Sequence, residues 1–339
     1  MDQRLQSLID WASTEIRRDA DMALDARVEM VSGDASFRRY YRMTFRDRSW
    51  VLVDAPPEKE DNPRFIRIAK QWRAAKVAVP EVLASDTEQG FMLLEDFGDR
   101  LFWQAVHEPT CQPGDIEGCY RQAIDQLIHI QTMDSSALPA YDEALLTSEM
   151  QLFRDWLCEQ QLQIALSDDE RQMFDQATGQ LVKVALSQAV VPVHRDYHSR
   201  NLMVRDAGEL GIIDFQDAVA GPIAYDLVSL LRDCYVRWDS AMVDELLAYY
   251  WKEARRQGVY RGEWSDLVRE FDWMGMQRHL KAAGIFARLN LRDGKPGYLD
   301  DIPNTCQYLV DVSAKYPELS GLHQWLRDVV QPALGERLA

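Results

Sequence analysis

The sequence contains few of the features that mark secreted or membrane proteins. Its five cysteines are odd in number, and no two of them have the two-residue gap of a zinc or redox motif. No uninterrupted apolar run approaches the roughly 18 residues of a membrane span. The opening stretch, MDQRLQSLIDWASTEI, has the pattern of an amphipathic helix rather than of a signal peptide. We therefore expect a soluble protein in the reducing environment of the cytoplasm, without a membrane partner.

Positive charge is also scarce. The chain of 339 residues has 38 Lys and Arg against 55 Asp and Glu, so its formal net charge is −17 at pH 7. Such a surface repels nucleic acid and anionic membranes, and neither is an expected partner. An anionic substrate such as a nucleotide would need a locally basic or metal-loaded site. No internal repeat or low-complexity tract interrupts the sequence, and we expect a monomer.

The hydrophobic pattern changes near residue 100. Before it, short alternating or apolar runs predict strands at 41–46, 49–55, 82–86 and 90–98 and a helix over 63–76. After it, helical periodicity extends over 116–133, 148–163, 168–187, 240–256 and 264–292. The predicted class is α+β, with a small antiparallel β-rich N-lobe over residues 1–97 and a large helical C-lobe over residues 98–339.

One motif carries most of the chemical information. Residues 191–204 read VPVHRDYHSRNLMV and match the H-x-D-x-x-x-x-N loop of kinase-like phosphotransferases. Asn201 opens a short apolar run, and a second apolar run, after the turn RDAGEL, ends at Asp214. An antiparallel hairpin of this register makes these two side chains neighbours, and oxygen ligands of this kind suit Mg²⁺. Asp196, in the adjacent loop, is the expected catalytic base.

The tripeptide Asp-Phe-Gly at 96–98 is also a metal-binding signature of protein kinases, but it stands in the wrong place. In kinases the metal-binding Asp follows the catalytic loop, whereas this tripeptide precedes it by about a hundred residues. The matching segment is IDFQD, with Asp214 as the ligand. The stretch from Glu95 to Phe97 ends the last predicted N-lobe strand, and we expect it to be the hinge whose backbone binds adenine.

The phosphates of a nucleotide need hydrogen-bond donors. The segment VSGDASFRRYYR precedes the first predicted strand, where a phosphate-covering loop is expected, and it offers Ser32, Gly33 and Ser36. The strand WVLVDAP that follows contains no lysine to pair with the phosphates. The candidates for that role are Lys59, Arg38 and Arg39.

With these residues in place, the chain resembles the aminoglycoside phosphotransferase family. The resemblance is carried by VHRDYHSRNLM, GIIDFQDAVAGPIAYDLVSLLRD and GDASFRRYYR. It implies a bilobal, protein-kinase-like fold with ATP and Mg²⁺ as cofactors. The family's second aspartate, in a Tyr-Asp-Leu sequence, matches Asp226 and supports the catalytic loop. His194 is expected to hold the same loop through hydrogen bonds.

Three further segments, DAPPEKED, QRHLKAAGIFARL and YLDDIP, are similar to a branch of the family that phosphorylates sugars at the anomeric carbon. This similarity implies an ATP-dependent sugar 1-kinase of peptidoglycan recycling, acting on N-acetylmuramate, N-acetylglucosamine or both. Asp233, Arg278, His279 and Lys281 are the candidates for sugar recognition, and one cation of the segment MQRHLKAAG could pair with the lactyl carboxylate of a muramate sugar.

Two other functions remain open at this point. The acceptor could be an aminoglycoside, choline, homoserine or a methylated thiosugar, and the acidic surface would attract a polycationic antibiotic. The missing strand lysine would also be compatible with a pseudokinase that binds nucleotide without catalysis. The presence of Asp196, Asn201 and Asp214 counts against that second alternative.

Overall fold

The computed structural model describes residues 2–19, 26–32, 37–205 and 208–338. It divides the chain into two compact units, the first formed by residues 1–105 and 201–216 and the second by residues 106–200 and 217–339. The sequence analysis placed a boundary between residues 97 and 98. The structure instead groups residues 98–105 and the hairpin at 201–216 with the first unit.

Backbone hydrogen bonds explain this grouping. The N–H of Val204 donates to the carbonyl of Arg100 at 2.8 Å, and the N–H of Ile212 donates to the carbonyl of Ala78 at 2.8 Å. Both strands of the hairpin are therefore hydrogen-bonded to the N-terminal part of the chain, although they lie far from it in the sequence.

The first unit is built around one antiparallel sheet with the strand order β1-β2-β3-β5-β4. Its elements are α1 (Gln3–Asp19), β1 (Arg27–Ser32), β2 (Arg39–Phe45), β3 (Arg48–Asp54), α2 (Asn62–Ala74), β4 (Val82–Asp86), β5 (Phe91–Glu95), the start of α3 (Phe102–His107), β7 (Leu202–Val204) and β8 (Leu210–Ile212). Strand β1 was not predicted. The segment that we expected to cover phosphates, before the first predicted strand, therefore comes after β1. The pair β7 and β8 forms a separate antiparallel hairpin.

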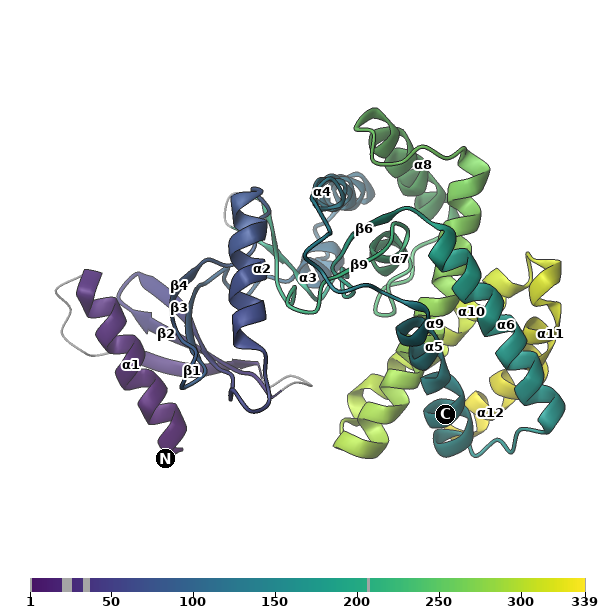
Figure 1. The fold of residues 1–339 in the computed structure, drawn as a ribbon, viewed down its shortest axis with the longest axis horizontal. Coiled ribbons are helices and arrows are strands. Elements are labelled where there is room, and N and C mark those ends of the chain that lie inside the picture. Colours follow the sequence, from purple (N-terminus) through teal and green to yellow (C-terminus); the bar gives the residue numbers. More distant parts are fainter. Residues whose placement is uncertain (1, 20–25, 33–36, 206–207, 339) are drawn as a thin grey trace. The chain divides into compact units, whose positions relative to one another are not determined.

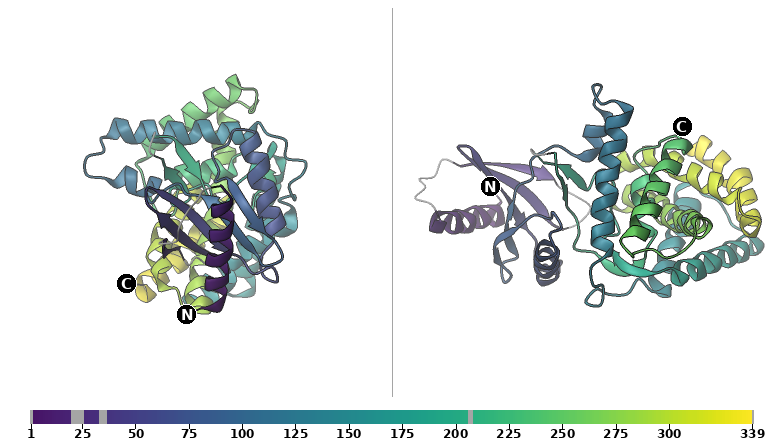
Figure 2. Two further views of the ribbon diagram at one scale, coloured as in Figure 1. Left: turned by 90° about the vertical axis from the view of Figure 1, so that its left-hand side faces the viewer. Right: turned by 90° about the horizontal axis from the view of Figure 1, so that it is seen from above.

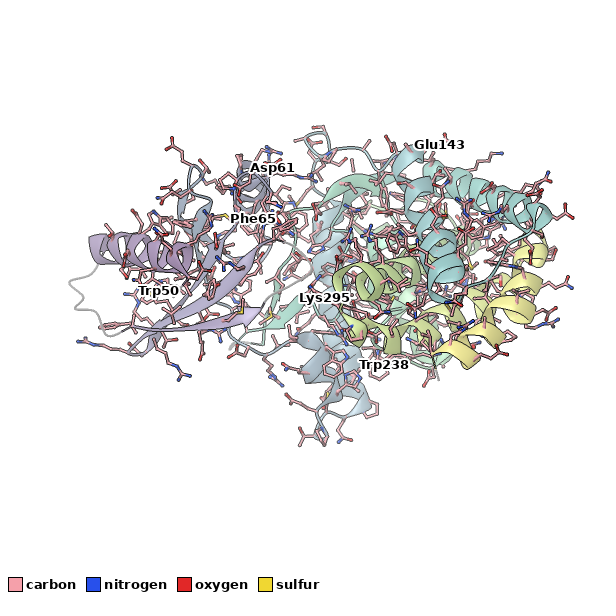
Figure 3. The ribbon with its side chains drawn as sticks, turned by 90° about the horizontal axis from the view of Figure 1, so that it is seen from below. Trp50, Asp61, Phe65, Glu143, Trp238 and Lys295 are labelled. Carbon is pink, nitrogen blue, oxygen red and sulfur yellow. The ribbon has the colours of Figure 1, made fainter. Side chains whose placement is uncertain are left out.

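Helix α1 lies along one side of the sheet, and α2 lies on the other side (Figure 1). The alternation of side chains along the strands produces this arrangement, because every second residue faces α1. Leu8 and Ala12 of α1 pack there against Tyr41, Trp50 and Leu52, and Trp50 is labelled in Figure 3. At the edge of this core, the buried carboxylate of Asp54 accepts hydrogen bonds from the α1 side as well as from its own sheet.

The second unit is mostly helical. Its elements are α4 (Pro113–Gln131), α5 (Glu143–Leu152), the π-helix η1 (Phe153–Gln161), α6 (Asp168–Ser187), β6 (Val190–Val193), β9 (Val219–Pro222), α7 (Tyr225–Leu231), α8 (Ser240–Arg256), α9 (Trp264–Asp293), the 3-10 helix η2 (Pro296–Asp301), α10 (Ile302–Ser313), the 3-10 helix η3 (Pro317–Leu319), α11 (Ser320–Trp325), the π-helix η4 (Leu326–Val330) and α12 (Gln331–Arg337). Strands β6 and β9 pair antiparallel. No helix in the described part of the chain is long and apolar enough to span a membrane.

Helix α9, of 30 residues, is the centre of this unit and contacts α5, α6, α7, α10 and η1 (Figures 1 and 2). It comes closest to its neighbours at Gly284. A Cβ atom added there would lie 2.3 Å from the carbonyl carbon of Leu152 and 2.5 Å from the nitrogen of Phe153. Glycine is therefore required where α9 meets the junction of α5 and η1.

All five cysteines lie in the second unit as free thiols. Cys158, Cys234 and Cys306 are buried, whereas Cys111 and Cys119 are partly exposed. Burial raises the pKa of each of the three buried thiols, so they remain protonated at neutral pH.

Candidate active site

The loop that contains the H-x-D motif follows β6 and is held by the start of α7. Both oxygens of the buried Asp226 carboxylate accept backbone hydrogen bonds, one from the N–H of His194 at 2.6 Å and one from the N–H of Arg195 at 3.0 Å. The ring of His194 is fully buried, and its Nδ1 accepts a hydrogen bond from the N–H of Asp196 at 3.3 Å. These contacts are those expected of two residues that hold the loop in one conformation.

Arg195 shows how firmly the loop is held. Its backbone has a φ of 78°, in the left-handed region that non-glycine residues rarely adopt. Its guanidinium donates to the Glu149 carboxylate at 2.6 Å. The strained backbone is therefore fixed from both sides, by Asp226 at the main chain and by Glu149 at the side chain.

Glu149 is the centre of a buried polar network. Besides Arg195, its carboxylate forms an ion pair with Lys281 Nζ at 3.3 Å and accepts a hydrogen bond from Gln277 Nε2 at 3.2 Å. Lys281 Nζ also donates to the hydroxyl of Tyr225 at 2.9 Å. One carboxylate thus faces two cations, and this part of the second unit retains positive charge.

That positive charge acts on Asp196. Burial by itself would raise the pKa of this carboxyl, but nearby positive charge, from Lys281 first and then from His198, Arg278 and Arg195, lowers the pKa to about 2. Asp196 is therefore ionised throughout the physiological pH range. A carboxylate in this state can accept a hydrogen bond from a hydroxyl group.

The hairpin carries the two predicted metal ligands. Asn201 precedes β7 and Asp214 follows β8, and the amide Nδ2 of Asn201 lies 3.4 Å from Asp214 Oδ2. Gln216 Nε2 donates to Asp214 Oδ1 at 2.7 Å, and Asp214 has a left-handed backbone with a φ of 64°. The described residues contain no group of three His, Cys, Asp or Glu side chains suited to a metal. Two oxygen-bearing side chains fit Mg²⁺, which takes part of its coordination from phosphates and water.

Phe215, the residue after Asp214, attaches this Asp-Phe segment to helix α2. The ring of Phe215 packs against helix α2, with its centroid 4.9 Å from that of Phe65 and 6.0 Å from that of Trp72; Phe65 is labelled in Figure 3. Asp214 is thereby fixed between the hairpin and α2.

The tripeptide at 96–98 has a different environment. The carboxylate of Asp96, 4% exposed, is held by the Arg42 guanidinium of β2, which donates to its two oxygens at 2.6 and 3.0 Å. The same guanidinium donates to the carbonyl of Gly98 at 3.0 Å and pairs with Asp99. Both oxygens of Asp96 are occupied by protein donors, so these contacts are structural.

The residues predicted to form the adenine hinge flank this ion pair. The side chain of Glu95 pairs with Arg73 of α2 and with Arg205 after β7, each at 2.9 Å. The Arg205 guanidinium lies 4.6 Å from the ring centroid of Phe97. These side-chain contacts fix the segment and leave the hinge assignment, which concerns its backbone, a prediction.

The predicted phosphate-binding segment is described only in part. Ser32 is the last residue of β1, and Gly33 and Ser36 lie outside the described residues. Lys59 is exposed, with its Nζ 4.2 Å from the ring centroid of Phe37.

The two arginine candidates for the phosphates have different surroundings. Arg39 donates to the buried Asp54 carboxylate on the α1 side of the sheet. Arg38 is buried, forms an ion pair with Glu60 at 2.9 Å and lies 5.7 Å from the ring of Phe65 on α2. Arg38, just before β2, and Glu60, just before α2, are thus a buried pair of opposite charges.

Two of the residues predicted to bind a sugar, Asp233 and Arg278, are deeply buried and already have protein partners. Asp233 accepts hydrogen bonds from the N–H and hydroxyl of Ser199, at 3.0 and 2.5 Å, and from the N–H of Tyr235 at 3.0 Å. Arg278 donates to the hydroxyl of Ser229 and to the sulfur of Cys234. These contacts favour a positioning role, and direct contact with a sugar stays a prediction.

Sequence reasoning did not find the network around Glu149. In the sequence, Glu149 is a single polar residue inside a helical pattern, and nothing links it to the H-x-D motif. Tyr225 was recognised only as the neighbour of Asp226 in the Tyr-Asp-Leu sequence. Lys281 was predicted as a candidate for sugar recognition, and its contacts with Glu149 and Tyr225 were not predicted. Their common position at the catalytic loop depends on the packing of α5 and α7 against α9.

The loop, the hairpin and the antiparallel sheet define a protein-kinase-like phosphotransferase. Solved structures share the fold. Choline kinase LicA from Streptococcus pneumoniae matches 90% of this chain and 99% of its own with a TM-score of 0.61 at 14% identity. An ethanolamine kinase from Plasmodium vivax matches 92% of this chain and 87% of its own with a TM-score of 0.59 at 10% identity. The predicted fold class is confirmed.

The chain belongs to the phosphotransferase enzyme family, whose model matches residues 27–259. It is 43% identical to an N-acetylmuramate/N-acetylglucosamine kinase of Pseudomonas aeruginosa, over 89% of this chain and 88% of that protein. It is 40% identical to a protein of the same name from Neisseria meningitidis, over 97% of this chain and 96% of that protein. The predicted family and kinase activity are confirmed, and the family implies ATP as the phosphate donor.

Proposed function

We propose that the protein transfers the γ-phosphoryl group of ATP to the anomeric C1 hydroxyl of N-acetylmuramate and N-acetylglucosamine, in the recycling of cell-wall sugars in the cytoplasm. The main support is the function named for relatives that are 38–43% identical over most of the chain. The state of Asp196 agrees with this chemistry, because an ionised carboxylate beside several cations is suited to orient a hydroxyl group.

Asp196 is the proposed catalytic residue. Its carboxylate accepts a hydrogen bond from the C1 hydroxyl, directs the oxygen towards the γ-phosphorus and receives the hydroxyl proton as the new P–O bond forms. The bond between the γ-phosphorus and the bridging oxygen breaks at the same time, and ADP leaves with the electron pair. Positioning and electrostatics supply most of the rate in phosphoryl transfer. An anomeric hydroxyl is more acidic than other sugar hydroxyls, so a carboxylate whose pKa is low is a sufficient base.

We propose that Asn201 and Asp214 would hold Mg²⁺, which would supply positive charge to the phosphates of the nucleotide. The hydrogen bond from Gln216 and the packing of Phe215 on α2 keep Asp214 in position. For the missing strand lysine, we favour Arg38 over Lys59. Arg38 is buried and paired with Glu60, as a cation that orients phosphates needs to be, whereas Lys59 lies exposed against Phe37.

The decisive test is ADP release with Mg²⁺-ATP and a panel of acceptors. N-acetylmuramate and N-acetylglucosamine should be phosphorylated, and the 1-O-methyl glycoside of N-acetylglucosamine, which lacks the C1 hydroxyl, should not. Chelating Mg²⁺ with EDTA should stop turnover. Turnover of kanamycin or choline in place of the free sugars would contradict the proposed substrate, and nucleotide binding without turnover of any acceptor would favour a pseudokinase.

A second prediction concerns Lys281 and pH. Its charge opposes the effect of burial on Asp196, so Lys281→Met should raise the pKa of Asp196. Because only the ionised carboxylate can act as the base, the acidic limb of the kcat/KM profile for N-acetylglucosamine should lie at higher pH than in the wild type, so the ratio of kcat/KM at low pH to that at about pH 8 should fall. Lys281→Arg, which keeps the cation, is the control and should retain the wild-type ratio. An identical pH profile for Lys281→Met would show that this charge does not control Asp196.

A further inference from the structure

A row of aromatic rings extends from the catalytic loop to the segment before α10. The ring of His198 meets that of Tyr235 edge-on at 5.1 Å, Tyr235 lies 6.0 Å from Phe286, and Phe286 stacks on Tyr298 at 5.6 Å. His198 is also one of the charges that act on Asp196. Its buried Nδ1 has no hydrogen-bond partner among the described residues. The row therefore begins beside the proposed base.

Asp301 is the last residue of η2, the 3-10 helix that also contains Tyr298. Its side chain is 17% exposed, and its nearest cation is the Nη1 of Arg200 at 3.9 Å. Within the described parts of the chain, no hydrogen bond to its carboxylate is observed, although such groups are usually hydrogen-bonded when buried. Burial raises the pKa of Asp301 to about 6, and Arg200 opposes that rise. A half-buried carboxylate of this kind is typical of ligand-binding positions.

Arg200 provides the opposite charge next to it. This residue immediately precedes Asn201, and its side chain is 39% exposed, with its guanidinium 3.7 Å from the ring centroid of Tyr235. At 3.9 Å, Arg200 and Asp301 are too far apart for a direct hydrogen bond. A cation and an anion are thus held side by side in the second unit, each partly accessible.

The cations predicted earlier for a substrate carboxylate are less accessible. Arg278 is 5% exposed and donates to Ser229 and Cys234, and Lys281 is 6% exposed and is shared between Glu149 and Tyr225. Binding a further anion through either side chain would disturb the network that supports the catalytic loop. The Arg200 side chain, at 39% exposed, is the more accessible cation.

The two proposed acceptors differ at one position. N-acetylglucosamine has a hydroxyl at C3, where N-acetylmuramate carries a lactyl ether that ends in a carboxylate. We propose that Arg200 and Asp301 form the subsite for this C3 substituent: Asp301 accepts a hydrogen bond from the C3 hydroxyl of N-acetylglucosamine, and Arg200 pairs with the lactyl carboxylate of N-acetylmuramate. This inference rests on the proposed function and explains how one site accepts both sugars.

Because Asp301 and Arg200 have opposite charges, their substitutions should change the ratio of the kcat/KM values for the two sugars in opposite directions. In Asp301→Asn, N-acetylglucosamine loses a charge-assisted hydrogen bond, while N-acetylmuramate loses a nearby negative charge that repels its own. In Arg200→Gln, N-acetylmuramate loses its counter-ion and N-acetylglucosamine loses little. Any general effect on the catalytic loop is common to both sugars and cancels in the ratio of their kcat/KM values.

The experiment measures kcat and KM for both sugars at saturating Mg²⁺-ATP. Asp301→Asn should lower kcat/KM for N-acetylglucosamine about tenfold, mainly through KM, and change that for N-acetylmuramate by less than about threefold. Arg200→Gln should lower kcat/KM for N-acetylmuramate about tenfold more than for N-acetylglucosamine, and Arg200→Lys should recover much of the difference. The preference for N-acetylmuramate over N-acetylglucosamine therefore rises in Asp301→Asn and falls in Arg200→Gln.

The chain offers matched controls. Arg237 is 38% exposed, lies 4.4 Å from the ring of Tyr308 and pairs with Asp311, so Arg237→Gln removes a similar arginine elsewhere in the second unit. Asp300→Asn removes the exposed carboxylate next to Asp301. A ratio that stays within about twofold of wild type in both test variants, or that moves as far in the controls, would overturn the proposal.

Failure of the proposed function gives a different result. If the wild type phosphorylates neither sugar, that function is wrong, and the subsite is then tested by calorimetric binding of both sugars to protein loaded with Mg²⁺ and a non-hydrolysable ATP analogue. Opposite shifts of the two Kd values in the variants would support the subsite. Unchanged Kd ratios, or no binding of either sugar to the wild type, would overturn it.

Discussion

Replacing Asp196 by Asn should lower kcat for N-acetylglucosamine by about a thousandfold, equivalent to about 4 kcal/mol of transition-state stabilisation. The amide has nearly the same size as the carboxylate, but it can neither receive the proton nor provide the negative charge that orients the hydroxyl. The loss should appear in kcat rather than in the KM for ATP, because Asp196 acts on the acceptor. The measurement is steady-state ADP release at saturating concentrations of both substrates.

The same variant should also be less stable. The surrounding cations keep the pKa of Asp196 at about 2, below the value of about 3.9 in an unfolded chain. The ionised group therefore contributes about 2 kcal/mol to the free energy of unfolding above about pH 4, and this contribution is lost as the pH falls towards about 2. Thermal denaturation at neutral pH should show a lower Tm for the variant.

Asp244→Asn, which removes an exposed carboxylate of α8, is the control and should leave both kcat and Tm unchanged. Wild-type kcat in Asp196→Asn would exclude this residue as the base. A large loss of kcat with unchanged nucleotide binding, measured with a fluorescent ATP analogue, would support the proposed assignment.

A Gly284→Ala substitution should lower the free energy of unfolding by about 3 kcal/mol. The new methyl group would lie 2.3 Å from the carbonyl carbon and 2.5 Å from the carbonyl oxygen of Leu152, and 2.5 Å from the nitrogen of Phe153. These atoms belong to the backbone of the facing helix and cannot move as a side chain does. Either α9 or the junction of α5 and η1 must shift, and Glu149 and Lys281 lie on those same elements.

Gly179→Ala is the matched control. Gly179 lies inside α6, and a Cβ atom added there meets nothing within 4 Å. Alanine should therefore increase the free energy of unfolding by up to about 1 kcal/mol, because it restricts the unfolded chain and favours the helix. Urea denaturation of both variants should show shifts of opposite sign. Equal shifts would mean that the approach of α9 is not the cause.

The sequence predicted regular elements well where periodicity was long. The helices expected at 240–256 and 264–292 were observed as Ser240–Arg256 and Trp264–Asp293. The strand Arg27–Ser32 was not predicted, because an edge strand with exposed Met30 and Val31 shows no clear polar face. The predicted helix 148–163 was observed as two helices, and its change to a π-helix at Phe153 lies where α9 packs at Gly284, a contact that periodicity does not encode.

The candidate site was predictable where its residues are close in sequence. Asp196 and Asn201 belong to one motif, and Asp214 follows from the register of a short hairpin. The environment of Asp196 was not fully predictable, since two of the charges that lower its pKa, those of Lys281 and Arg278, lie on a distant helix. The role of the tripeptide at 96–98 followed from its order in the chain, but its partner Arg42 became known only from the register of the sheet.

The distribution of the thiols provides a built-in probe of folding for one part of the molecule. The first unit contains no cysteine, whereas the second has two partly exposed thiols and three buried ones. A thiol reagent added to the native protein should therefore react quickly with Cys111 and Cys119 only. Reaction of the other three requires the second unit to open, so the rate of the slow phase measures the opening of the helical unit separately from the sheet.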